Sequence, residues 1–183
     1  ANSVAATLGE ELFETKVGFK EFKPVIGKAL VYFEESDGIS VIGHTPEKDA
    51  YIGLLLALDM VVATGRNLSE IKRQMDDIYG EFYPDRDGVL VSLKGDDLLK
   101  ALAGLEKYEV GSTVKVGSRE KTIKEIISKD GRKMIFEDDS WLMIRPSGTE
   151  PKVRFYVESR DPDGTTLLVE AAKSMLLEIG LLD

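Results

Sequence analysis

The chain has 183 residues, of which 43% are hydrophobic and 31% charged, so it is long enough for one large or two small domains. Its 24 Lys and Arg residues against 33 Asp and Glu residues give a net charge of −9, which disfavours nucleic acid as a partner. With no cysteine and one histidine, His44, the chain excludes disulfides, a thiolate nucleophile and a two-histidine metal site. No apolar run approaches the ~20 residues that span a bilayer, and the N-terminus does not resemble a signal peptide. We therefore expect a cytoplasmic protein without a membrane partner.

The first residues alternate short helical and strand patterns. The spacing of Val4, Leu8 and Leu12 predicts a helix over 3–12. The patterns that follow predict a strand over 12–17 (LFETKV), a helix over 20–28, a strand over 29–35 (ALVYFEE) buried on both faces, and a strand over 39–44 (ISVIGH).

The clearest helix is predicted over 45–65, with Thr45 as its N-cap. Apolar residues run nearly all round it, which is typical of a buried helix. An amphipathic helix follows over 68–80, with Asn67 or Ser69 as its cap.

The pattern changes near residue 80, where EFYPDRDG reads as a turn-rich junction and predicts a domain boundary. Residues 1–80 are expected to form an α/β partial domain with an incomplete mixed sheet and helices. Residues 81–183 are expected to form an α+β domain with a small, mainly antiparallel sheet and helices on one face. The second domain is predicted to contain strands over 89–93, near 113–116 and 133–137, and over 140–144 and 152–159, and helices over about 95–107 and 164–180.

One stretch, IRPSGTEPKVRFYVES over residues 144–159, concentrates anion-binding chemistry. Arg145 offers forked donors that suit a phosphate or carboxylate, and Ser147 and Thr149 add hydroxyl donors. Gly148 permits positive φ and close approach of a ligand to the backbone, where successive N–H groups can form an anion-binding nest. The stretch therefore predicts a phosphate-binding loop. The alternative is an ordinary turn, because Pro, Ser and Gly favour turns in any case.

Three segments together carry a family resemblance. RPSGTEPKVR (145–154) closely resembles the phosphate-binding loop in the last domain of the α-D-phosphohexomutases, the family of phosphoglucomutase and phosphomannomutase. YFEESDGIS (32–40) resembles that family's sugar-recognition loop, and ETKVGFKEF (14–22) resembles the segment that precedes it in the third domain. Since the three occur in family order, the chain is identified as a C-terminal fragment that covers part of domain 3 and domain 4.

The resemblance also implies roles for individual residues. The phosphate that is not transferred would be held by Arg145, Ser147, Gly148 and Thr149. Glu34 and Ser36 would hydrogen-bond the sugar hydroxyls, and Lys20 would lie at the substrate cleft as a cation. The chain departs from the family pattern at Phe33 and Asp37, which stand where glycines are usual.

The full-length family enzyme, by this resemblance, interconverts hexose 1-phosphate and hexose 6-phosphate through a bisphosphorylated sugar and an enzyme phosphoserine. It uses Mg²⁺ and a glucose 1,6-bisphosphate primer. The phosphoserine loop and the aspartate-rich metal loop are not found in this sequence, and PDRDG, with Asp85 and Asp87, is interpreted as a turn. We therefore expect no catalytic residue, no metal ligand and no bound cofactor in this chain, which would recognise a phosphosugar and be inactive without the N-terminal domains.

Three alternatives remain open at the level of sequence. The chain could be a stand-alone phosphosugar-binding or regulatory module, part of a phosphoglucosamine-type mutase, or an interaction protein. An incomplete domain with an exposed sheet edge favours some self-association.

Overall fold

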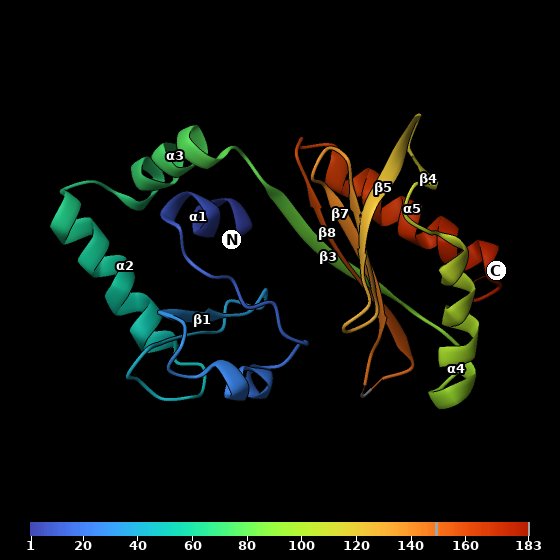
Figure 1. Cartoon of the computed structure of the whole chain (residues 1–183), viewed down its shortest axis with the longest axis horizontal. Coiled ribbons are helices and arrows are strands. Elements are labelled where there is room, and N and C mark those ends of the chain that lie inside the picture. The colour runs from blue at the N-terminus through green and yellow to red at the C-terminus, as the bar shows by residue number, and fades with distance from the viewer. Residues whose placement is uncertain (149, 183) are drawn as a thin grey trace. The chain divides into compact units, whose positions relative to one another are not determined.

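The computed structural model describes residues 1–148 and 150–182. The chain forms two compact units, Ala1–Gly80 (unit 1) and Glu81–Asp183 (unit 2), and both mix helices with strands (Figure 1). The predicted mixture of an α/β part and an α+β part is confirmed.

Unit 1 is built around a single β-hairpin. Its elements are α1 (Asn2–Leu8), the 3₁₀ helix η1 (Phe19–Val25), β1 (Val31–Phe33), β2 (Ile39–Val41), α2 (Ala50–Thr64) and α3 (Leu68–Tyr79). The two strands are antiparallel, with Tyr32 opposite Ser40. In β1 only Tyr32 is buried, so the predicted burial of this strand on both faces is wrong. The predicted strand over 12–17 does not form within the described residues either.

Helix α2 begins later than the sequence predicts. Its N-cap is Asp49, whose carboxylate accepts a hydrogen bond from the Tyr51 N–H at 2.8 Å, so the predicted cap at Thr45 is wrong. His44 Nε2 lies 2.8 Å from the other Asp49 oxygen. The hydrogen bond from His44 and those from backbone N–H groups lower the pKa of Asp49. An ionised carboxylate at this end complements the helix dipole.

The predicted burial of α2 is also wrong, because none of its residues is buried in unit 1. Five large side chains form an exposed stripe at helical spacing: Tyr51, Leu54, Leu55, Leu58 and Val62. The opposite side faces the hairpin, since a Cβ added at Gly53 would lie 2.9 Å from Ile39 Cγ2. The helix is therefore apolar on two sides and has a partner on one of them.

Helix α3 begins with a capping box. The Asn67 side chain accepts from the Glu70 N–H, and the Glu70 carboxylate accepts from the Asn67 N–H. Of the two caps that the sequence left open, the structure selects Asn67 over Ser69. None of the described helices is by itself long and apolar enough to cross a membrane. Helices α2 and α3 meet the length and hydropathy criteria only when they are taken together, and they are bent by 84° relative to each other.

Unit 2 is an antiparallel sheet covered by helices on one face (Figure 1). Its elements are β3 (Tyr83–Leu90), α4 (Gly95–Leu102), the 3₁₀ helix η2 (Ala103–Lys107), β4 (Thr113–Val116), β5 (Arg119–Ile127), β6 (Arg132–Phe136), β7 (Trp141–Pro146), β8 (Lys152–Ser159) and α5 (Gly164–Glu178). The strand order is β3-β8-β7-β6-β5-β4. The predicted bounds of β4 and β8 are confirmed.

The core of unit 2 lies between this sheet and α5, which contacts β3, β4, β7 and β8. Strand residues with under 2% exposure include Phe136, Ile144 and Phe155, and they pack with Leu168 and Leu176 of α5. Because side chains alternate along a strand, the residues between these core positions point to the other face of the sheet. That alternation determines which side chains surround the loop between β7 and β8, the candidate phosphate-binding loop.

The sequence analysis missed β5 and misplaced β3, for which it predicted a strand over 89–93. The stretch YPDRDGVL forms β3, with Asp85 opposite Val157 and Asp87 opposite Phe155, so the interpretation of PDRDG as a turn is wrong. Strand β3 lies at the edge of the sheet, where a proline such as Pro84 is tolerated. Strand β5 was missed because its alternating charged residues do not give a clear apolar pattern.

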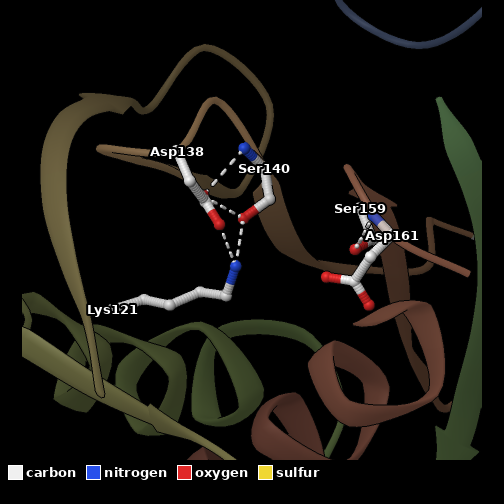
Figure 2. A network of polar contacts seen from close by, with 5 residues as sticks. All are labelled: Lys121, Asp138, Ser140, Ser159 and Asp161. Carbon is white, nitrogen blue, oxygen red and sulfur yellow. Dashed lines mark hydrogen bonds and ion pairs between the residues drawn. The ribbon is translucent and has the colours of Figure 1, made fainter. Parts of the chain in front are cut away.

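The turn between β6 and β7 is closed by a polar network (Figure 2). Ser140 Oγ donates to Asp138 Oδ1 at 2.6 Å, and Lys121 Nζ donates to Asp138 and, at 3.0 Å, to Ser140 Oγ. Asp139 takes a left-handed conformation in this turn, with φ 64°. Lys121 belongs to β5, so the network ties three strands together just before the chain enters β7.

Candidate functional site

The candidate phosphate-binding loop joins β7 to β8. Arg145 of β7 lies directly opposite Arg154 of β8, and Pro146 lies opposite Val153. Ile144 and Val153 point into the core, so by alternation both arginines point to the face of the sheet away from α5. Like charges directly opposite one another destabilise a strand pair. Two guanidinium groups in this register therefore favour a site where an anion can lie.

Arg145 is partly sequestered. Its side chain is 16% exposed, its Nε lies 3.5 Å from Asp130 Oδ2, and that buried Nε has no hydrogen-bond partner within the described residues. Gly131 makes this position possible. It has φ 84°, and a Cβ there would lie 2.5 Å from both Arg145 Cβ and the Ile144 carbonyl oxygen.

Glu150, which would repel a bound anion, lies against Arg154 instead. Its Oε2 accepts a hydrogen bond from Arg154 at 2.9 Å. The carboxylate therefore braces one of the two arginines. Arg154, the second arginine of the pair, lies on the same face of β8 as Lys152 and Tyr156.

The backbone of the loop differs from the predicted nest. The Ser147 N–H donates to the Lys152 carbonyl at 2.8 Å, so it already has an acceptor. Gly148 does not have positive φ, and a Cβ added there would meet nothing within 4 Å. The conformational reason given for this glycine is therefore wrong, although the space beside it is open. Thr149, predicted to add a hydroxyl donor, lies outside the described residues.

The candidate sugar-recognition loop follows β1 in unit 1. The Glu34 N–H donates to the Gly38 carbonyl and the Asp37 N–H to the Glu34 carbonyl, which closes a tight turn. Asp37 stands where the family usually has glycine and has φ 65°, a conformation that Asp tolerates better than most residues. The departure at Asp37 is thus accommodated by the turn.

Glu34 of this loop is a nearly buried hydrogen-bond acceptor. Its side chain is 8% exposed, and its Oε2 lies 2.9 Å from Lys48 Nζ and 3.4 Å from Ser36 Oγ. The absence of a side chain at Gly38 leaves room for the Glu34–Lys48 ion pair, because a Cβ at this position would lie only 2.8 Å from Lys48 Cδ. The turn thus brings Glu34 and Ser36 together, as a shared sugar-binding role requires.

Lys48 is the residue of this loop that sequence reasoning missed. Its hydrogen bond with Glu34, followed by the charge of that carboxylate, raises the pKa of Lys48, so it is a cation at neutral pH. The sequence feature that could have identified Lys48 is its position directly before Asp49, the N-cap of α2. Lys20, by contrast, lies on η1 with a 77% exposed side chain, 4.0 Å from Glu21; its role at a cleft stays a prediction.

The described part of the chain holds no group of three or more His, Asp or Glu side chains that could bind a metal ion. Asp87 of the PDRDG stretch accepts a hydrogen bond from the Gly88 N–H at 2.7 Å and forms an ion pair with Lys173 of α5 at 3.3 Å. The hydrogen bond from the Gly88 N–H and the interaction with Lys173 lower the pKa of Asp87, although partial burial acts in the opposite direction. Its role in the described structure is to join β3 to α5.

Comparison with known proteins matches both units to one family. Residues 1–79 match phosphoglucomutase/phosphomannomutase, alpha/beta/alpha domain III, and residues 89–173 match phosphoglucomutase/phosphomannomutase, C-terminal domain. The chain therefore belongs to the phosphoglucomutase/phosphomannomutase family.

Individual relatives agree with this assignment. The chain is 26% identical to phosphoglucomutase 1 of Drosophila melanogaster over 97% of this chain and 36% of that protein. It is 29% identical to the phosphoglucosamine mutase of Carboxydothermus hydrogenoformans over 88% of this chain and 31% of that protein. A crystal structure of a proposed phosphomannomutase from Thermus thermophilus superposes with a TM-score of 0.72 at 27% identity, covering 96% of this chain and 33% of that one. The chain thus spans about a third of the length of these relatives.

Proposed function

We propose that this chain is the substrate-recognition part of a phosphohexomutase that interconverts hexose 1-phosphate and hexose 6-phosphate. The observation that carries the proposal is the opposed pair Arg145 and Arg154, with the buried Arg145 Nε left without a hydrogen-bond acceptor within the described residues. A phosphate beside this pair would accept charge-assisted hydrogen bonds and relieve the repulsion between the two guanidinium groups. The Ser147 hydroxyl and the Gly148 N–H are the next donors along the loop.

The sugar would be recognised at the turn after β1. An ionised carboxylate accepts hydrogen bonds only, so Glu34 suits two sugar hydroxyls as donors, while Ser36 can donate or accept. Lys48 Nζ occupies one oxygen of Glu34 and so orients the carboxylate. Lys20 is retained in the proposal as an exposed cation for the sugar or its phosphate.

Gripping the distal phosphate and the hydroxyls would orient the reacting end of the sugar. Binding energy from groups that do not react can increase the rate in this way. The phosphoserine that donates and recovers the phosphoryl group would come from the N-terminal domains of the full-length enzyme.

Magnesium does not fit the residues described here, since they contain no cluster of three potential ligands. We therefore assign Mg²⁺ and the glucose 1,6-bisphosphate primer to the full-length enzyme, with none bound by this chain alone. A purified chain supplied with both should show no mutase turnover, and measurable turnover would contradict the division of labour proposed here.

A phosphoglucosamine-type substrate is the second candidate, because the phosphoglucosamine mutase of Carboxydothermus hydrogenoformans is among the relatives. A stand-alone phosphosugar-binding module would use the same two loops without any turnover. Calorimetric titration with glucose, mannose and glucosamine 6-phosphates separates the substrates.

The test of the phosphate-binding loop compares Arg145→Ala with Arg119→Ala. Arg119 is an exposed arginine of the same sheet, on β5, and serves as the matched control. Arg145→Ala should weaken glucose 1,6-bisphosphate binding by about 2 kcal/mol or more, roughly thirtyfold, on the scale of a charge-assisted bidentate contact. Arg119→Ala should leave the affinity unchanged. Equal affinities in the two variants would show that the loop is only a turn.

A further inference from the structure

Glu150 is an acidic residue in the candidate phosphate-binding loop, and the proposed function gives it no role toward the ligand. Its Oε2 accepts a hydrogen bond from Arg154 Nη2 at 2.9 Å. The pair joins the end of the loop to β8, the strand that carries Arg154. Carboxylates and phosphates both accept charge-assisted hydrogen bonds from a guanidinium group. Glu150 therefore uses a donor of Arg154 that a bound phosphate could also use.

The backbone holds Glu150 beside Arg154, but its side chain is free to move away. The Lys152 N–H donates to the Glu150 carbonyl at 2.8 Å, and the Ser147 N–H donates to the Lys152 carbonyl at 2.8 Å. These two bonds close the loop around the main chain of Glu150. The side chains of Arg154 and Glu150 are 41% and 55% exposed. An exposed ion pair is weak, because water solvates both partners when they separate, so the carboxylate can exchange with another anion.

Arg145, the opposite member of the arginine pair, has a carboxylate of a different kind. Asp130 Oδ2 lies 3.5 Å from Arg145 Nε, and the side chains of Arg145 and Asp130 are only 16% and 25% exposed. This contact is more sequestered than the one between Glu150 and Arg154. Each guanidinium group of the opposed pair thus has its own carboxylate nearby, which offsets part of their mutual repulsion. Of the two carboxylates, Glu150 is the one that exposure makes exchangeable.

We propose that Glu150 is an internal competitor for phosphate, which occupies Arg154 in the empty loop and leaves it when the phosphate of a sugar binds. The inference rests on the proposed function and concerns the regulation of its phosphate site. Binding then breaks one charge-assisted hydrogen bond on Arg154 as it forms another, so the net gain is smaller than at an unoccupied arginine. Glu150 therefore lowers the affinity of the loop for phosphate.

A lowered affinity suits the proposed interconversion of hexose 1-phosphate and hexose 6-phosphate. In that reaction the loop holds the phosphate at one end of the sugar while the other end reacts, and later holds the phosphate of the other end. It must therefore release phosphate as well as bind it. Affinity differences at one interface are mostly differences in dissociation rate, so a competitor at Arg154 shortens the time for which phosphate stays bound.

The test compares Glu150→Gln with the unmodified chain in amide NMR titrations with inorganic phosphate, followed at residues 145–148. Glutamine keeps the size of the side chain and removes its charge. Glu150→Gln should bind phosphate about two- to fivefold more tightly, the range that an exposed ion pair implies. The matched control is Glu158→Gln, on the same face of β8. Because Glu158 accepts from Trp141 Nε1 at 3.1 Å and not from Arg154, this variant should change the affinity by less than about 1.3-fold.

A double-mutant cycle identifies the partner through which Glu150 acts. In an Arg154→Ala background, where Arg145 remains to bind phosphate, Glu150→Gln should no longer increase the affinity. A full increase in that background would overturn the proposal, because Glu150 would then act as a distant negative charge. A damaged loop cannot bind more tightly, so the expected increase does not depend on how the variant folds.

The remaining outcomes separate this inference from the proposed function. Equal or weaker binding by Glu150→Gln, with measurable binding by the unmodified chain, would overturn the role of Glu150 and leave the phosphate-binding loop in place. Absence of phosphate binding by the unmodified chain and by Glu150→Gln alike would overturn both.

Discussion

The two units of this chain contain similar proportions of apolar sequence but use it differently. In unit 2 the core extends over six strands and α5 and includes Phe136, Phe155 and Leu176, each with under 2% exposure. In unit 1 the buried hydrophobic residues are Phe19 and Tyr32 within the described chain. The difference teaches that an apolar pattern predicts burial only where a second layer exists to cover it, as a six-stranded sheet provides for α5 and a two-stranded hairpin does not for α2.

The largest expected effect comes from truncating one phenylalanine in each unit. Phe136 is fully buried and Phe33 is 52% exposed. Phe136→Ala should lower the free energy of unfolding by about 3–5 kcal/mol through lost burial and a cavity, whereas Phe33→Ala should lower it by less than about 1 kcal/mol. Urea denaturation followed by fluorescence of the single tryptophan, Trp141 of β7, reports unit 2, and far-UV circular dichroism covers both units. Similar losses in the two variants would remove the contrast between the units.

Two glycines near the candidate phosphate-binding loop allow a comparison within unit 2. Gly131 has φ 84° and no room for a Cβ beside Arg145, whereas Gly148 has open space. Gly131→Ala should destabilise the unit by about 1–3 kcal/mol, and Gly148→Ala should change stability by less than about 0.5 kcal/mol. Thermal unfolding of both variants checks this, and a tolerant Gly131 would show that the strand end holding Arg145 can rearrange.

The cap of α3 gives a smaller and local effect in unit 1. Asn67→Ala removes the acceptor of the capping box and should reduce helix stability by about 1 kcal/mol. Ser69→Ala, at the alternative cap position, should have little effect, because Ser69 Oγ only donates to Asn67 Oδ1. Helical ellipticity at 222 nm during heating measures both. A larger loss in Ser69→Ala would reverse the assignment of the cap.

The smallest effect is a pH dependence at the β6–β7 turn. Burial alone would raise the pKa of Asp138, but hydrogen bonds from Lys121 and Ser140 outweigh it and leave the pKa below the ordinary value of 3.8. The stabilisation is therefore complete above pH 3.8 and is lost as the pH falls through the lower pKa of the folded state. Since the side chain is 47% exposed, screening limits this to less than about 1 kcal/mol. Asp138→Asn should lower the free energy of unfolding at pH 6, and this free energy should then decline less steeply toward pH 3 than in the unmodified chain. The urea midpoint of unfolding, measured at several pH values, tests this. Parallel pH profiles of the two proteins would show that Asp138 does not contribute.

Sequence patterns were sufficient where local and tertiary preferences agree. Polar and apolar residues alternate over the first four positions of KVRFYVES, which forms β8 with the predicted bounds and has Lys152 and Arg154 on one face. The patterns failed where tertiary context decides. Pro84 and Gly88 read as turn residues, yet the edge position of β3 tolerates Pro84, and Gly88 allows close approach to Val153, whose carbonyl oxygen would lie 2.7 Å from an added Cβ.

The candidate site shows the same limit. The motif residues of both loops could be selected from sequence, but their neighbours could not. Lys48 reaches Glu34 across 14 residues of sequence, and Asp130 and Gly131 reach Arg145 through the pairing of β6 with β7. These contacts depend on the register of strands, which no local pattern encodes.

The most direct measurement is an amide NMR titration of this chain with glucose 1,6-bisphosphate, with inorganic phosphate as the comparator. The account predicts shifts from both ligands at residues 145–148 and 152–154, and additional shifts at residues 34–38 from the phosphosugar alone. Absence of any shift at residues 145–154 at millimolar ligand would contradict the claim that the opposed arginines form a phosphate-binding site in this chain.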